Sequence, residues 1–436
     1  MEEKVYQIEG IGECRFRLAF FHPDLKALAF LLGEANNRFE YCISFGKVSN
    51  TLLQDPSLCF SCDLDVVGQW TLEEREKSGV LQQKMKEERK SKLVRYTKLK
   101  QLKSRQLCPP PIAPFVDRIA PDHLHSRNLT VQHEFIIFLR LLLWLLPKST
   151  DGMEFRLLPE SCALRIFCSE VLKSKAGKAS GQLYKWTLQF YQQQTITFRL
   201  KGKHSRYILE NFPIFCSALL SRAIPEIPLE AKIRLMGHFI VFQKLSIVYS
   251  FLCRSSSIAA YFDELREAAS DYYNTVALFS RLFPTAWLVG KASVPLAEQM
   301  EERFGVGPGT GLGEACESKH NSLREYYSHT NNIDIWPTVL RHDSVACRLI
   351  LKRQPLKQLI RRLNRTSKCA QTRPSKTKEE AALASAALCS DPLYTEILSC
   401  VRQQQLSPSL RCSLAKCVFS APKGVGVEEE EETSMH

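Results

Sequence analysis

The 436-residue chain is long enough for two or three domains, and its 44% hydrophobic and 10% aromatic content excludes an intrinsically disordered protein. A net charge of +13 and a pI near 9.0 favour an anionic partner, nucleic acid first and an acidic membrane surface second. The apolar run Phe135–Leu146 is too short to span a bilayer and contains Arg140, so we expect no membrane segment. The start of the chain is charged and lacks the apolar core of a secretion signal, so the 16 cysteines are expected to be free thiols in a reducing, intracellular compartment.

The N-terminal segment predicts two strands followed by a helix. Val5–Phe21 alternates loosely between apolar and polar residues and is divided at Gly10–Gly12. Leu25–Gly33 has helical periodicity, with Asp24 at its start and a glycine at its end. Asp24 is either an ordinary helix cap or an acidic residue placed for chemistry where a strand gives way to a helix, and the local sequence favours neither.

A long basic stretch comes next. Leu72–Leu107 has a helical pattern, and the prolines after Cys108 are expected to end it. Because its cations fall on nearly every face, the stretch is either a solvated arm or a surface that lies along phosphates, and the basic character of the whole chain favours phosphates. The DNA-binding candidates are ten Lys/Arg against two glutamates: Lys84, Lys86, Arg89, Lys90, Lys92, Arg95, Lys98, Lys100, Lys103 and Arg105.

The middle of the chain predicts an all-helical region. Six stretches have apolar residues at helical spacing: Thr130–Pro147, Pro159–Lys175, Gln182–Gln194, His204–Ala223, Leu229–Arg254 and Ala259–Leu282. Thr195–Leu200 is a candidate strand or extended linker. Beyond this region, Trp336–Leu363 predicts a further helix, Ala381–Leu406 one or two helices, and Glu428–Glu432 belongs to a disordered acidic tail.

A glycine-rich loop precedes a pair of acids. Five glycines and Pro308 forbid regular structure over Gly305–Gly313. Glu314 and Glu317 then open a predicted helix, and a spacing of three places both carboxylates on one side of its first turn. They either complement the helix dipole or deliver an acidic ligand to a metal site.

Three phrases occur together in one order: Asp24-Leu25-Lys26, then Asp122-x-x-His125 after a Pro-Phe phrase, then Glu314-Ala-Cys-Glu317-Ser before a basic, aromatic helix. In this order the chain resembles the RNase H-like DDE transposases, nearest to the Transib transposases and the catalytic subunit of the V(D)J recombinase, over about residues 13–350. The resemblance implies that Asp24 and Glu317 hold Mg²⁺ or Mn²⁺ at one cleft, with Glu314 supporting them. The Asp122–His125 phrase is explained equally well as a simple helix cap and its neighbour.

The chain departs from the family at the first catalytic Asp. That residue belongs on an opening strand upstream of Asp24, but the only acids there are glutamates, at positions 2, 3, 9 and 13. With one ligand of the three-acid site unassigned, we do not expect the chain as it stands to cleave or transfer DNA strands.

The zinc positions of the family are also altered. Relatives carry Cys-x-x-Cys near Cys42, where this chain has Phe45 at the second position. A Cys-x-x-Cys pair does occur at Cys59 and Cys62, but one pair is only half of a tetrahedral site, so bound Zn²⁺ is not expected.

These observations predict a mixed α/β, mostly α fold: an incomplete RNase H-like core with a large all-helical insertion. The predicted regions are N-terminal core strands (1–70), a basic helical arm (71–113), the helical insertion (114–290), a return to the core with the acidic helix (291–365) and a mostly disordered tail with possible short helices (366–436). The predicted function is that of a transposon-derived nuclear DNA-binding protein with latent or lost catalysis. A second copy of the chain is a candidate partner, and no small-molecule cofactor is expected. The alternative is a non-catalytic nuclear scaffold built on the helical insertion.

Overall fold

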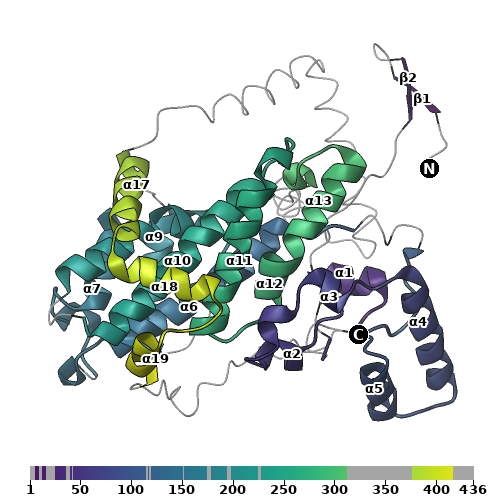
Figure 1. The fold of residues 1–436 in the computed structure, drawn as a ribbon, viewed down its shortest axis with the longest axis horizontal. Helices are drawn as coiled ribbons and strands as arrows, with labels where there is room; N and C mark the ends of the chain where they lie inside the picture. Colours follow the sequence, from purple (N-terminus) through teal and green to yellow (C-terminus); the bar gives the residue numbers. More distant parts are fainter. Residues whose placement is uncertain are drawn as a thin grey trace, which may run out of the picture. The chain divides into compact units, whose positions relative to one another are not determined.

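The computed structural model describes residues 5–8, 12–15, 25–35, 40, 41, 43–113, 116, 119–150, 152–173, 178–193, 198–223, 227–311 and 376–415 (Figure 1). Two compact units divide the chain, residues 1–311 with 380–436 and residues 312–379. Nearly all described residues belong to the first unit, and the packing below is that of this unit.

The predicted N-terminal strands are present as a two-stranded antiparallel sheet. β1 (Val5–Ile8) pairs with β2 (Gly12–Arg15), and Val5 lies opposite Arg15. Apart from this pair, the described residues contain only two isolated β-bridges. The expectation of a mostly α fold is therefore confirmed, whereas an RNase H-like sheet is not shown by the described part of the chain.

The first helix ends where the sequence predicted. α1 (Leu25–Leu32) is followed by Gly33 at φ +66°, a left-handed conformation that favours glycine. A Cβ on Gly33 would also lie 2.7 Å from the carbonyl oxygen of Cys108. Both the backbone angle and this close approach therefore require glycine. Three short elements follow, α2 (Asn50–Gln54), the 3₁₀ turn η1 (Cys59–Ser61) and α3 (Leu64–Val67).

The single helix predicted over Leu72–Leu107 is wrong, because the structure has two helices. α4 (Leu72–Glu87) ends before Arg89, whose positive φ of 56° turns the backbone out of the helix. α5 (Lys92–Gln101) then starts at Ser91, whose hydroxyl accepts a hydrogen bond from the Val94 N–H at 3.3 Å. The reversal comes from local caps, so the prolines after Cys108 are not what ends the helix.

Six long helices form the core, and each of the six stretches predicted in this region overlaps one of them, although three of the helices begin before the predicted start. They are α6 (His123–Trp144), α7 (Ala163–Lys173), α8 (Lys178–Gln193), α9 (Gly202–Arg222), α10 (Leu229–Leu252) and α11 (Phe262–Phe279). α10 contacts α6, α9 and α11 (Figure 1). Buried aromatic rings fill the space between them, such as Phe212, which stacks on Phe242 at 4.0 Å and meets Phe138 edge-on at 4.9 Å. Short 3₁₀ turns connect the helices: η3 (Lys148–Thr150), η4 (Phe155–Leu157) and η5 (Ala259–Tyr261). In the candidate strand Thr195–Leu200, the described residues 198–200 have no regular structure.

α10 is the one described helix that is long and apolar enough to cross a membrane. Of its most apolar 18-residue window, 78% is buried inside the protein. Such burial is typical of the central helix of a core and does not contradict the expectation that the chain has no membrane segment.

The chain after α11 packs back on that helix. α12 (Pro284–Trp287), a π-helical turn η6 (Leu288–Ala292) and α13 (Ser293–Phe304) all contact α11. The described part of the glycine-rich loop holds one 3₁₀ turn, η7 (Pro308–Gly311). A Cβ on Gly307 would lie 2.0 Å from the carbonyl oxygen of Ser256, so this glycine allows the loop to lie against the chain that follows α10.

The predicted tail contains helices over residues 376–415, where the sequence predicted one or two helices over Ala381–Leu406. These residues form α17 (Lys376–Cys389), α18 (Pro392–Arg402) and α19 (Pro408–Ala415). α18 packs on α10 and α11, and the Tyr394 hydroxyl donates to Gln243 Oε1 at 2.9 Å. Asp271 of α11 accepts from both Lys244 (2.8 Å) and Arg402 (3.2 Å). The C-terminal helices therefore complete the core, which their sequence alone does not reveal because their partners lie more than 100 residues away.

Candidate nucleic-acid interface

The basic arm is a helical hairpin with a defined start. Thr71 and Glu74 form a capping box, in which the Glu74 N–H donates to the Thr71 hydroxyl (3.1 Å) and the Thr71 N–H donates to the Glu74 carboxylate (3.0 Å). These bonds satisfy donors that the first turn of α4 leaves free. The capping box therefore defines where α4 begins, and the basic residues lie further along the hairpin.

A buried ion cluster holds the base of this hairpin. The side chain of Glu34, just after α1, is fully buried and forms ion pairs with Arg75 of α4 and with Arg105. The distance from Arg105 Nε to Glu34 Oε2 is 3.1 Å. Ser44 also donates to Glu34 at 2.6 Å. Charges removed from water require such complementary partners. The cluster therefore joins α1, α4 and the end of the hairpin at one point.

Arg105 is accordingly removed from the predicted DNA-binding set. Its side chain is only 1% exposed, and its Nη2 donates to the Ala35 carbonyl oxygen at 2.5 Å. A phosphate could not reach this guanidinium without breaking the pair with Glu34. The charge of Arg105 serves the folded structure instead.

Hydrogen bonds from the Gln106 amide and a close backbone contact at Gly79 also hold the base of the hairpin. Gln106 donates to the Cys108 carbonyl oxygen at 2.7 Å and also to that of Leu32. A Cβ on Gly79 in α4 would lie 2.3 Å from the nitrogen of Pro109, so the segment after α5 crosses directly over this glycine. The hairpin is therefore attached rigidly at its base.

Beyond the base, the hairpin presents unneutralised positive charge. Seven of its cations are exposed and two are half-buried: Lys84, Lys86, Arg89, Lys90, Lys92, Lys100 and Lys103 in the first group, Arg95 and Lys98 in the second. Within the part of the chain that the structure describes, none of the nine forms an ion pair with a carboxylate, and Glu87 and Glu88 are the only acids between Lys84 and Lys103. Nine cations against two acids produce a strongly positive surface.

Two of these lysines make interactions weaker than an ion pair, Lys92 with an aromatic ring and Lys100 with the charge of Glu40. The Lys92 ammonium lies over the Tyr96 ring, 5.4 Å from its centroid. The Thr51 hydroxyl, and to a smaller extent the charge of Lys100, lower the pKa of Glu40. Both contacts leave the ammonium groups at the protein surface, where a phosphate oxygen can approach them.

The Asp122–His125 phrase forms a helix cap. Asp122 Oδ1 accepts from the N–H groups of Leu124 (2.9 Å) and His125 (3.1 Å) at the start of α6. Its other oxygen lies 2.6 Å from His125 Nδ1. Burial acts to raise the pKa of Asp122, but the hydrogen bonds and charge of His125 outweigh it and the pKa is lowered. The simpler of the two explanations offered by the sequence accounts for this phrase.

The Cys59 and Cys62 thiols are also used within the fold. The Cys62 thiol lies 2.8 Å from the Cys59 carbonyl oxygen and 3.2 Å from the Tyr273 hydroxyl. Burial raises the pKa of both thiols. No group of three or more His, Cys, Asp or Glu side chains suited to a metal ion occurs among the residues described.

The proposed catalytic acids Asp24, Glu314 and Glu317 lie outside the described residues, as does Cys42. Their proximity therefore stays a prediction.

The ion cluster at Glu34 was missed by the sequence reasoning. The buried side of α4 consists of Arg75, Ser78, Gly79 and Gln82. These residues carry no apolar periodicity, and the adjacent small pair Ser78-Gly79 is the only local sign that this side of α4 is covered.

Comparison with protein-family models, with curated proteins and with solved structures gave no match for this chain.

Proposed function

We propose that the chain binds nucleic acid, duplex DNA in the first instance, through phosphate contacts made by the α4–α5 hairpin. The observation that carries the proposal is the set of nine hairpin cations without a carboxylate partner among the described residues, held on a base fixed by Glu34. Like charges at this density repel one another in the free protein, and a polyanion relieves that repulsion. Phosphate binding also releases counterions from the DNA, which makes such binding strongly dependent on salt.

The resemblance to DDE transposases supplies the biological setting of this proposal. A transposon-derived DNA-binding protein in the nucleus, with metal-dependent strand cleavage latent or lost, agrees with the sequence phrases and with the unassigned first Asp. If the chemistry is retained, Asp24 and Glu317 hold the Mg²⁺ or Mn²⁺. We expect no nicking of supercoiled plasmid with either metal, and cleavage that disappears in both Asp24→Ala and Glu317→Ala would contradict this expectation.

The binding proposal is tested by the salt dependence of duplex affinity. With about six phosphate contacts, the slope of log K against log salt is expected to be roughly −5, at about 0.9 per phosphate. The variant with Lys86, Lys90, Lys92 and Lys100 changed to Gln should flatten this slope by about two to four. All four side chains are exposed, so the fold should be retained.

A matched control removes the same charge elsewhere. Lys148, Lys185, Lys201 and Lys203 are also exposed but belong to the helical core region. Their fourfold change to Gln lowers the net charge equally and should change the slope by less than about one. An equal loss in both variants would mean that binding follows net charge and not the hairpin. A slope near zero in the unmodified chain would overturn the proposal.

A protein-interaction scaffold is the second candidate. The sequence placed this scaffold on the helical insertion, whereas the observation that favours it lies on the hairpin. The hairpin exposes apolar side chains beside its cations, with Val80 57%, Leu93 77% and Val94 48% exposed. Exposed apolar residues that are close together are typical of protein interfaces. A scaffold would bind its partner through these side chains with little salt dependence, so Leu93→Ser with Val94→Ser should abolish partner binding but leave DNA affinity within about twofold.

A further inference from the structure

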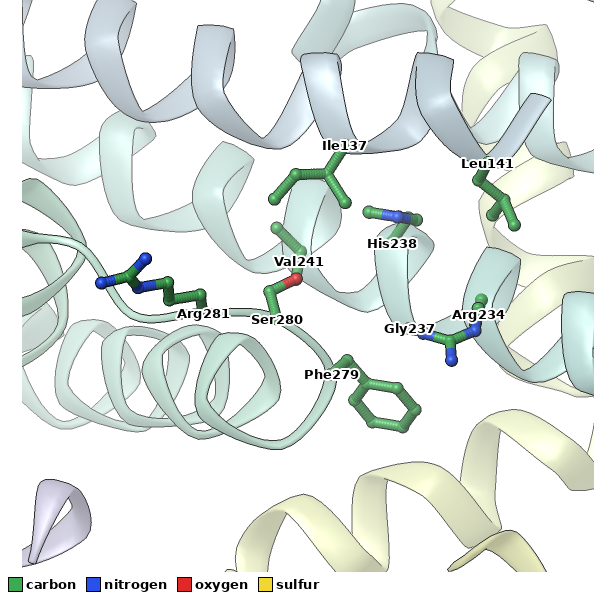
Figure 2. Close-up of a pocket in the computed structure, with 9 residues that line it drawn as sticks. All are labelled: Ile137, Leu141, Arg234, Gly237, His238, Val241, Phe279, Ser280 and Arg281. Carbon is green, nitrogen blue, oxygen red and sulfur yellow. The ribbon is translucent and has the colours of Figure 1, made fainter. Parts of the chain in front are cut away.

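A pocket of about 200 Å³ lies between α6, α10 and the end of α11, away from the basic hairpin in sequence (Figure 2). Ile137 and Leu141 of α6, Val241 of α10 and Phe279 of α11 form its apolar walls. A small, mostly apolar pocket with a few polar groups is typical of a ligand-binding site.

One polar group in the pocket is a buried histidine. His238 is 8% exposed, and its ring meets Phe138 edge-on with the centroids 6.0 Å apart. Its Nδ1 has no hydrogen-bond partner among the described residues. Burial, and to a smaller extent the charge of Arg234, lower the pKa of His238 to about 3, so the ring is neutral at pH 7. A buried polar atom without a partner is unfavourable, and a bound polar group would satisfy it.

The charged groups of the pocket are two arginines, and no Asp or Glu lines it. The guanidinium of Arg281 points away from the other lining residues in Figure 2, and its Nε donates to Gln54 at 2.6 Å. The guanidinium of Arg234 lies on the side of Gly237 and Phe279, and its Nε donates to Glu230, one turn earlier in α10, at 3.3 Å. Arg234 is therefore the cation that a ligand inside the pocket would meet.

We propose that this pocket binds a small monocarboxylate with an apolar, preferably aromatic, body. The body would lie against Ile137, Val241 and Phe279, and the carboxylate would lie toward Arg234 and His238. No Asp or Glu lines the pocket, and the one carboxylate beside it, that of Glu230, is paired with Arg234. The apolar walls select against small inorganic anions, which lose hydration without gaining apolar contact. The pocket is smaller than those that hold drug-sized molecules, so the ligand class is that of single-ring acids.

The first test compares two probes of the same shape. Phenylacetate and its neutral analogue phenylacetamide are titrated into the full chain at pH 7 by calorimetry, without DNA. Phenylacetate should bind at least fivefold more tightly than the amide. Equal affinity for both probes would overturn the role of charge, and the absence of heat for either would overturn the site.

Substitutions on α10 should then change the phenylacetate affinity in opposite directions. Arg234→Gln should weaken it at least fivefold, whereas Glu230→Gln, which removes the competing carboxylate, should strengthen it two- to fivefold. A structural role of the ion pair alone would make both variants behave alike. Equal effects of the two changes would therefore refute the placement of the carboxylate.

Gly237→Ala provides a control that retains the fold. The new Cβ would lie 3.4 Å from the Phe279 ring, an ordinary contact, and alanine is favoured over glycine inside a helix. Thermal stability should be equal or higher, while the narrowed pocket should bind phenylacetate at least threefold more weakly. Unchanged affinity would place the probe elsewhere on the chain. None of these results depends on whether the hairpin binds DNA.

Discussion

Glu134 of α6 has a buried carboxyl group with an unusual environment, and its replacement should change how stability depends on pH. Its side chain is fully buried, and neither carboxyl oxygen has a hydrogen-bond partner among the described residues. The Tyr272 hydroxyl from α11 is also buried close to Glu134, and it too has no hydrogen-bond partner among the described residues. Burial raises the pKa of Glu134 from 4.5 to about 8, so the carboxyl group is mostly protonated at neutral pH.

The sign and size of the effect follow from this pKa. Below pH 4.5 the carboxyl group is protonated in both folded and unfolded chains, and Glu134 causes no pH-dependent loss of stability. As pH rises from 4.5 toward 8, the unfolded chain releases the proton while the folded chain retains it, so stability falls. At about 1.4 kcal/mol per pH unit, the fall between pH 5 and pH 8 amounts to roughly 3 to 4 kcal/mol. Burial raises the pKa of Tyr272 and Tyr249 as well, so these phenols stay neutral over the same range.

Glu134→Gln should remove this dependence, since glutamine has nearly the same shape and does not titrate. The free energy of unfolding is measured by urea denaturation at pH 5, 6, 7 and 8 for both proteins. The difference between variant and unmodified chain should grow with pH in favour of the variant. Glu160→Gln, whose carboxyl group is 93% exposed, is the control and should run parallel to the unmodified chain. Parallel pH profiles for Glu134→Gln and the unmodified chain would refute the reasoning.

Three further predictions concern packing. Glu34→Gln removes the carboxylate that pairs with the buried guanidinium groups of Arg75 and Arg105. The free energy of unfolding from urea denaturation should fall by about 3 to 5 kcal/mol, and a fall below about 1 kcal/mol would contradict the ion cluster. Gly79→Ala should lower the melting temperature because its Cβ would meet backbone atoms at 2.3 Å, whereas Gly181→Ala, which meets nothing within 4 Å in α8, should gain up to about 1 kcal/mol. Deleting residues from 376 onward exposes the side of α10 and α11 that α18 covers, so the shortened chain should bind a hydrophobic dye and melt at lower temperature, and an unchanged melting temperature would contradict this packing.

The helices of the core could be predicted from the sequence because their information is local. Apolar residues at spacings of three and four define a helix and the side it buries, and this pattern located α6 to α11. Gly33 at the end of α1 was also predictable, because a left-handed residue after a helix is commonly glycine, although Arg89, Lys103 and Gln404 adopt the same conformation in this chain.

The division of the basic arm was not predictable in the same way. Arg89 adopts a positive φ although it is not glycine, and the N-cap Ser91 is the local sequence signal for a new helix start beside it. The sequence also did not show that Arg105, unlike the other nine cations, is buried. Its burial depends on Glu34, about 70 positions earlier, and a composition of ten similar cations does not distinguish the one that pairs inside the fold.

The sequence by itself determined the mostly helical class, the positions of the core helices and the excess of positive charge, since each depends on residue type and short-range spacing. Only the tertiary structure decided which charges are available to a partner and which are neutralised inside the protein. It also placed the C-terminal helices on α10 and α11, and brought His238 and Arg234 to the wall of a pocket. The physical reason is that a buried polar group needs a partner, and that partner is often far away in the sequence. The spacing of apolar residues along one helix contains no information about such distant partners.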